Sequence, residues 1–257
     1  MGFATIEGRT IHYEYPQEAE AGYKKGHTVL MVHGAYDNHK VWASQHRHLE
    51  LEHTPLSLDL PGHGDSEGPP INDAQGFRRF VKAFADVLGL APFVFCGHSM
   101  GGSMALDYAV YHPSELKGLV LVGSSPDWDV SREAIDMWKN NPEKAREGNA
   151  DLLFSKRTPK HIRERYTRQL RSAPADTCVA DSEACNSYDL SKQIRQIEIP
   201  ALVICGDEEE WINGSRAIHS RLRNSTLEIV PAAGHAILVE QPDQINDALV
   251  AYLSTLP

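Results

Sequence analysis

The chain has 257 residues, of which 41% are hydrophobic and 23% charged, and its formal net charge is -10. This composition excludes wholesale disorder and suits one large α/β domain or a domain that carries an insertion. The negative charge argues against broad nucleic-acid binding, because a phosphate backbone would be repelled. No apolar run reaches the roughly 18 residues of a membrane span, and the four cysteines are too scattered for a disulfide framework, so we expect a cytoplasmic protein.

In chain order, short apolar runs alternate with longer amphipathic stretches. Residues 3–8 and 10–16 predict a β-hairpin near the amino terminus. Continuous apolar runs, typical of strands buried on both faces, follow at 28–34, 56–62, 93–97, 118–123, 201–206 and 226–231. The apolar spacing of helices is found at 77–90, 103–112 and 245–256. This alternation predicts an α/β fold with a mostly parallel eight-stranded sheet and helices on both faces.

Residues 124–198 break the alternation, because they contain no strand-like run between two strands that both look buried. Helical patterns in this segment cover 132–140, 150–155 and 160–172, and the last is expected to begin with Thr158 as N-cap and Pro159 as first residue. A crossover needs only about a dozen residues. The segment is therefore interpreted as a helical lid, inserted after the sixth strand and lying over one end of the sheet. The core then consists of residues 1–123 and 199–257.

A glycine-flanked serine follows the predicted strand at 93–97. Residues 97–102 read GHSMGG, and a helical stretch comes next. In a G-x-S-x-G turn between a strand and a helix, small neighbours let the chain turn sharply and lift the hydroxyl above the sheet edge. The helix N-terminus then favours an oxyanion at that point. Ser99 is therefore the candidate nucleophile, and the alternative is a glycine-rich turn with an incidental serine.

A serine hydroxyl is a poor nucleophile without a base, and His235 is the best of thirteen histidines for that role. It follows the last predicted strand, so we expect it at the same sheet end as Ser99. The order serine, acid, histidine then requires a carboxylate in the loop after the strand at 201–206. Four acids compete in that loop, and the residues alone leave the choice open: Asp207, Glu208, Glu209 and Glu210.

Taken together, these motifs resemble the α/β-hydrolase family over nearly the full length of the chain. The matching pieces are His33-Gly34 after the third strand, DLPGHGDS at 59–66, GHSMGG at 97–102, the acidic loop after the strand at 201–206, and AGH at 233–235. With the helical lid and the ending GHAILVEQPDQIN, they are similar to the branch of small serine carboxylesterases, enol-lactonases and carrier-ester hydrolases. The resemblance implies an α/β-hydrolase fold with a helical lid.

Members of this family usually place the acid three residues after the glycine that ends the strand. That position is Glu209 here, with Glu in place of Asp, so the resemblance implies Glu209 as the third member of a catalytic triad. Asp207 is the fallback, and Asp127 is a more distant candidate. The resemblance also implies an oxyanion hole made by the backbone N–H groups of Met100 and Ala35.

The implied activity is that of a serine hydrolase, which cleaves a carboxylic ester, thioester or lactone through an acyl-enzyme intermediate. Ser99 would attack the acyl carbonyl, His235 would take its proton, and Glu209 would orient the imidazole. A serine nucleophile disfavours the dehalogenases and epoxide hydrolases of the family, which use a carboxylate. The alternatives are C–C bond hydrolysis or perhydrolysis on the same triad, and a non-catalytic ligand-binding member of the fold. The sequence has no zinc-ligand spacing and no phosphate-binding loop, so we expect neither a metal nor a cofactor.

The predicted lid concentrates positive charge within an acidic chain. Residues 151–172 contain the acids Asp151 and Glu164 and seven basic residues, which are Lys156, Arg157, Lys160, Arg163, Arg165, Arg168 and Arg171. Ile162, Tyr166 and Leu170 share one face of the predicted helix, and we expect that face to pack downward. A solvated helix face is the simpler interpretation of the charge. The functional interpretation is docking of an acyl carrier or CoA ester, in addition to a small-molecule ester substrate.

Overall fold

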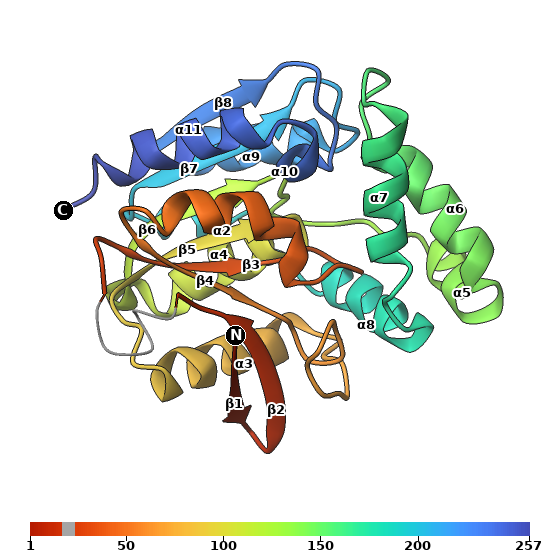
Figure 1. The fold of residues 1–257 in the computed structure, drawn as a ribbon, viewed down its shortest axis with the longest axis horizontal. Coiled ribbons are helices and arrows are strands. Elements are labelled where there is room, and N and C mark those ends of the chain that lie inside the picture. The colour runs from red at the N-terminus through yellow and green to blue at the C-terminus, as the bar shows by residue number, and fades with distance from the viewer. Residues whose placement is uncertain (17–23) are drawn as a thin grey trace.

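The computed structural model describes residues 1–16 and 24–257, and a β-sheet lies at its centre (Figure 1). Within these residues the strands are β1 (Gly2–Ile6), β2 (Arg9–Glu14), β3 (Thr28–Val32), β4 (Thr54–Leu58), β5 (Phe93–His98), β6 (Leu116–Val122), β7 (Ala201–Gly206) and β8 (Ser225–Val230). Their order in the sheet is β1-β2-β4-β3-β5-β6-β7-β8. β1 pairs antiparallel with β2 and β2 with β4, whereas the remaining neighbours are parallel. The predicted mostly parallel, eight-stranded sheet is confirmed.

Helices cover both faces of this sheet. Outside the segment between β6 and β7 they are η1 (His39–Trp42), α2 (Ala43–Leu49), α3 (Ala74–Val87), α4 (Met100–Tyr111), η2 (Pro113–Glu115), α9 (Ile212–Arg221), α10 (Ile237–Glu240) and α11 (Pro242–Leu253). No helix in the described part of the chain is both long and apolar enough to cross a bilayer.

The apolar strands are explained by two separate cores, one on each face of the sheet. In β3, Leu30 and Val32 contribute to one apolar cluster, whereas Val29 and Met31 contribute to the other. This alternation follows from the two-residue period of a strand. Side chains of α3, α4 and α9 fill the first cluster, and side chains of α2 and α11 fill the second. Both faces are therefore buried, which is why the inner strands read as continuous apolar runs.

The segment between β6 and β7 is helical in the part that the structure describes. Its helices are α5 (Arg132–Asn140), α6 (Pro142–Leu153), α7 (Lys160–Leu170), α8 (Ala175–Asn186) and the short η3 (Gln193–Gln196). Figure 1 shows α5, α6 and α7 grouped beyond one end of the sheet, with α8 nearer to the strands. The helical patterns predicted α5 and α7 closely, and α6 begins earlier than its predicted pattern at 150–155. No pattern predicted α8.

The start of α7 differs from the predicted cap by one residue. Pro159, and not Thr158, occupies the N-cap position, and it makes no side-chain capping hydrogen bond. The Thr158 hydroxyl instead donates to the carboxylate of Glu240 in α10. The Thr158 side chain, which the local pattern predicts as the helix cap, therefore makes a tertiary contact instead.

Candidate active site

Ser99 occupies a strained turn between β5 and α4. Its φ is 54° and its ψ is -120°, a backbone conformation that residues with a Cβ rarely adopt. The turn is sharp enough that a Cβ added at Gly97 would lie 2.1 Å from the carbonyl oxygen of Gly101, so glycine is required there. The Ser99 N–H donates to the carbonyl oxygen of Val122 at 2.8 Å, which fixes the turn against β6. Ser99 thus lies beyond the carboxyl end of β5 at the start of a helix.

The three side chains that the sequence analysis selected form one hydrogen-bonded chain. His235 Nε2 lies 2.9 Å from Ser99 Oγ, and His235 Nδ1 lies 2.7 Å from Glu209 Oε1. Because an ionised carboxylate can only accept, the Nδ1–H donates to Glu209 and Nε2 is left to accept the Ser99 O–H. All three residues are buried, with 8% or less of their surface exposed. The loops after β5, β7 and β8 supply them, as expected for one end of a parallel sheet.

The competing acids have other positions and partners. Asp207 is exposed, and its Oδ1 accepts the Ala233 N–H at 3.4 Å. Asp127 Oδ2 accepts the Ser191 hydroxyl at 2.6 Å. Glu208 contacts the helical segment, where Oε2 accepts the Ser155 hydroxyl at 2.8 Å. Glu209 is the member of this group that reaches His235.

Burial and a contact with the backbone of its own loop hold the Glu209 carboxylate in position to bind His235. Its side chain is fully buried, and its second oxygen, Oε2, lies 3.4 Å from the Gly206 N–H. The indole of Trp211 meets the imidazole of His235 edge to face, with ring centroids 4.8 Å apart. The hydrogen bond between Glu209 and His235 is therefore shielded from water, which strengthens it.

The two expected oxyanion donors lie beside Ser99. Met100 is the first residue of α4, so its N–H belongs to the first helical turn, whose amides have no acceptor within the helix. The chain before Ala35 passes directly against the serine, because a Cβ added at Gly34 would lie 2.8 Å from Ser99 Cβ. Ala35 and Ser99 line the same cavity. An anion formed on a carbonyl bound to Ser99 would meet this end of α4, where the helix dipole favours negative charge.

Two histidines support these loops as neutral, buried groups. His98 Nε2 donates to the carbonyl oxygen of His235 at 2.9 Å, and burial together with the nearby His235 lowers the pKa of His98 to about 3. His33 Nδ1 donates to the Gly34 carbonyl at 2.8 Å, while its Nε2 accepts the Leu60 N–H at 3.1 Å. Burial lowers the pKa of His33 to about 4. Both rings therefore remain uncharged at neutral pH, and their hydrogen bonds to backbone groups hold the adjoining loops in place.

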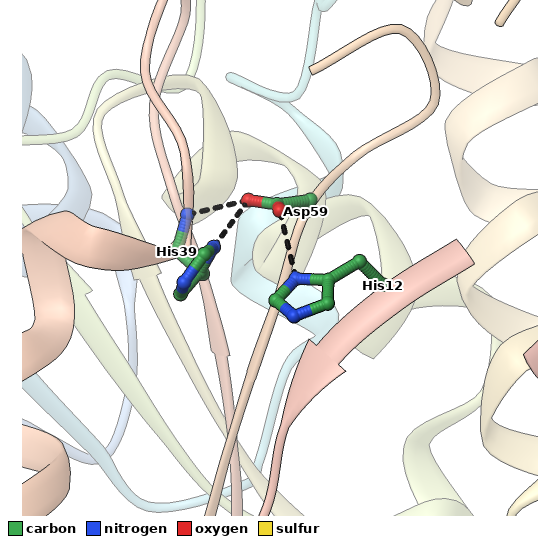
Figure 2. A group of neighbouring side chains, drawn as sticks. All are labelled: His12, His39 and Asp59. Atoms are coloured by element: carbon green, nitrogen blue, oxygen red, sulfur yellow. Dashed lines mark hydrogen bonds and ion pairs between the residues drawn. The ribbon is translucent and has the colours of Figure 1, made fainter. Parts of the chain in front are cut away.

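A group with the composition of a metal site lies away from Ser99, where His12, His39 and Asp59 meet (Figure 2). Asp59 accepts from His12 Nδ1 at 2.9 Å, from His39 Nδ1 at 2.8 Å, from the His39 N–H at 2.7 Å and from the Asp65 N–H at 3.0 Å. Burial alone would raise the pKa of Asp59, but His39 and the Asp65 N–H hold it well below its usual range. Because the Asp59 carboxylate and the Nδ1 atoms of both histidines are already hydrogen-bonded to one another, the group fits an anchor for the loop after β4 better than a metal centre.

A cavity of about 830 Å³ opens above Ser99 and His235. Its lining is rich in apolar and aromatic side chains from the core and from the helical segment, including Trp128, Val130, Met137, Trp138, Leu152, Leu153, Tyr166, Leu170 and Trp211. The charged side chains along it are Asp127, Asp129, Glu133, Lys144 and Glu210. No local sequence pattern predicts this lining, because its members come from distant segments without a shared motif.

The basic segment of the predicted lid is only partly available for a partner. Arg163 Nε donates to the Thr158 carbonyl at 3.1 Å, and Arg157 pairs with Glu208 at 3.1 Å. The remaining arginines of the segment are exposed, and they are Arg165, Arg168 and Arg171. Tyr166 is buried, with its ring in the apolar cluster that includes α11. Tyr166 and Leu170 of the predicted apolar face therefore pack toward the core, whereas Ile162 is half-buried and belongs to none of the apolar clusters of the described residues.

Comparisons with known proteins agree with this fold. A family model described as "Alpha/beta hydrolase family" matches residues 29–248. A 2-hydroxy-6-oxo-6-phenylhexa-2,4-dienoate hydrolase of Comamonas testosteroni is 22% identical, over 95% of this chain and 91% of its own. The esterase EaEST from Exiguobacterium antarcticum superposes with a TM-score of 0.89 at 21% identity, covering 99% of this chain and 100% of that one. The enol-lactonase from Burkholderia xenovorans LB400 gives 0.88 at 20% identity, covering 98% and 100%.

Proposed function

The chain belongs to the alpha/beta hydrolase family, and we propose that it is a serine hydrolase that cleaves a carboxylic ester, with thioesters and lactones as related substrates. The hydrogen-bonded chain from Ser99 through His235 to Glu209 carries the proposal. The alternative, an incidental serine in a glycine-rich turn, does not explain why Ser99 contacts a histidine whose second ring nitrogen binds a buried carboxylate. A non-catalytic binding member of the fold would not need that arrangement either.

The proposed reaction proceeds through an acyl-enzyme. Ser99 Oγ attacks the acyl carbonyl while His235 Nε2 takes its proton, and the Glu209 carboxylate stabilises the imidazolium. The N–H groups of Met100 and Ala35 stabilise the tetrahedral oxyanion. The imidazolium then protonates the leaving alkoxide, and the acyl group stays on Ser99. His235 next removes a proton from water, whose oxygen attacks the acyl carbon, so that the carboxylic acid leaves and Ser99 regains its proton.

The cavity favours an apolar, uncharged substrate. Its volume of about 830 Å³ lies in the range of sites for drug-sized molecules, and its aromatic lining suits an apolar acyl or alcohol group. The described residues that line it include no arginine, and four acids face one lysine, Lys144. A carboxylate-bearing substrate, such as the dienoate in the name of the Comamonas relative, would find little compensation for its charge there. This charge pattern favours an ester over C–C hydrolysis of an anionic substrate.

Residues 124–198 form the lid in this proposal, with 1–123 and 199–257 as the core. Support comes from the cavity lining, to which α5, α6 and α7 contribute alongside the loops after β5 to β8. A cover of this kind excludes water from the acyl-enzyme and shapes the pocket for the acyl or alcohol group.

Two measurements test the proposal. A fluorophosphonate probe should label Ser99, and p-nitrophenyl esters of increasing chain length should be hydrolysed. Ser99→Ala should abolish labelling and lower turnover by about 10³-fold or more. Ser215→Ala changes another buried serine, whose hydroxyl contacts the Ser124 carbonyl, and should retain both properties. Labelling at a different residue, or an unlabelled wild-type protein without esterase activity, would refute the proposal.

A further inference from the structure

The residue that follows Ala35 has an unusual backbone conformation. Tyr36 has a φ of 68°, in the left-handed region that a residue with a Cβ adopts only when its surroundings hold it there. Its peptide bond joins it directly to Ala35, the proposed oxyanion donor. Whatever holds Tyr36 in this conformation therefore also sets the direction of the neighbouring peptide groups.

Helix α8 holds Tyr36 at two points. Asp181 Oδ2 accepts the Tyr36 backbone N–H at 2.7 Å, and Ser182 Oγ lies 2.7 Å from the Tyr36 hydroxyl oxygen. The Ser182 hydroxyl donates to the Cys178 carbonyl at 2.8 Å, so the Tyr36 hydroxyl is the donor to Ser182. Consecutive residues of one helix thus bind both the backbone and the side chain of the residue after Ala35.

Asp181 is itself fixed from the core side. His63, in the loop after β4, places Nε2 2.9 Å from Asp181 Oδ2, and both side chains have no exposed surface. Burial lowers the pKa of His63, but the charge and hydrogen bond of Asp181 outweigh it, and the net shift is upward. Among the described residues, Asp181 Oδ1 has no hydrogen-bond partner. Asp181 therefore binds both Tyr36 and His63 through one oxygen atom, Oδ2.

The next residue along the same loop is held by a different helix of the segment. Asp37 accepts the Tyr166 hydroxyl at 2.6 Å and the Gln169 side-chain amide at 2.8 Å, and both donors belong to α7. The loop after β3 is thus bound by α8 at Tyr36 and by α7 at Asp37. A helical segment that only covered the pocket would not need these buried polar contacts, which cost free energy unless they are complete.

We propose that Asp181 is a positioning residue, which holds the backbone after Ala35 so that the Ala35 N–H faces the oxyanion formed at Ser99. The inference rests on the proposed serine hydrolase function and adds to it. Helix α8 is then part of the oxyanion hole, because the hole is complete only while Asp181 is seated against Tyr36. Asp181 touches no reacting atom, so its effect is on the transition state rather than on substrate binding.

The test compares three variants of the full-length protein with a p-nitrophenyl ester. Asp181→Ala removes the acceptor and should lower kcat about 10- to 100-fold with little change in KM, since small misplacements of oxyanion donors have effects of this size. Asp181→Asn keeps an oxygen for the Tyr36 N–H and should recover most of the rate. Thr177→Val is the matched control, because Thr177 also lies on α8 but its hydroxyl binds the Gly62 carbonyl at 3.1 Å instead.

Two further readouts separate positioning from general destabilisation. An aryl trifluoromethyl ketone forms a tetrahedral adduct with an oxyanion, so its inhibition constant should rise in proportion to the fall in kcat for Asp181→Ala. Hydrogen exchange of residues 33–38 should accelerate in that variant and not in Thr177→Val. Should Asp181→Ala fail to fold, Ser182→Ala removes the acceptor of the Tyr36 hydroxyl together with one hydrogen bond inside α8, and it should shift kcat and the inhibition constant in the same direction.

The inference fails if Asp181→Ala, or Ser182→Ala in its place, leaves kcat and ketone inhibition at wild-type values. It also fails if Thr177→Val causes the same loss. Neither result affects the proposed function, which is tested separately by labelling of Ser99 in the wild-type protein.

Discussion

Glu209→Gln is the substitution that most directly probes the proposed triad. The amide is nearly the same size as the carboxylate and fits the same buried position, so the fold should be preserved. It cannot carry the negative charge that faces His235 Nδ1. The change therefore removes the partner of the imidazolium that forms as Ser99 loses its proton.

The distance in the structure sets the size of the expected effect. Opposite unit charges 2.7 Å apart attract by about 6 kcal/mol at an effective dielectric constant of about 20. Because each 1.36 kcal/mol in the barrier corresponds to a factor of about ten, kcat should fall roughly 10⁴-fold. Glu209→Asp retains the charge but shortens the side chain by about 1.5 Å, which breaks the hydrogen bond. Its kcat should lie between those of the wild type and Glu209→Gln.

The assay is the steady-state hydrolysis of a p-nitrophenyl ester, with thermal unfolding measured for each variant. Asp207→Asn is the control, since Asp207 is exposed in the same loop and should tolerate the loss of charge. The assignment is refuted if Glu209→Gln keeps more than a tenth of the wild-type kcat while unfolding normally. It is equally refuted if Asp207→Asn loses as much activity as Glu209→Gln.

Two other predictions concern the contacts of α7. Burial raises the pKa of Asp37 from 3.8 to about 6, so the folded protein binds more protons than the unfolded chain between these values, and stability should fall as pH rises through that window. This titration should lower the free energy of unfolding by up to about 3 kcal/mol between pH 4 and 7 in the wild type, and the decrease should be absent from Asp37→Asn. Urea denaturation of both proteins measures the two pH profiles, and parallel profiles would contradict the prediction. If exposed arginines dock an acyl carrier or CoA ester, Arg168→Glu with Arg171→Glu should raise KM for that ester at low salt and leave p-nitrophenyl ester hydrolysis unchanged. Equal, small effects on both substrates would mean that this helix face is merely solvated.

Local patterns in the sequence were sufficient for the central sheet. A strand covered on both faces must be apolar along its length, so β3, β5 and β7 could be read directly from their residues. The strained turn at Ser99 also has a local signature, because only small residues fit beside it. The sequence order of Ser99 and His235, combined with the parallel sheet, predicted that both lie at one end of the fold.

Only the tertiary structure decided which side chains meet across long separations. Four adjacent acids follow β7 with nothing local to distinguish their partners, and folding brings Glu209 to His235 and Glu208 to Ser155. Helix α8 escaped prediction for a related reason. Its buried face includes polar residues such as Asp181 and Ser182, which are stabilised by hydrogen bonds to distant loops rather than by an apolar stripe. Hydrophobic periodicity predicts which residues are buried in an apolar core. It cannot predict the burial of a polar side chain whose hydrogen-bond partner lies more than a hundred residues away in the sequence.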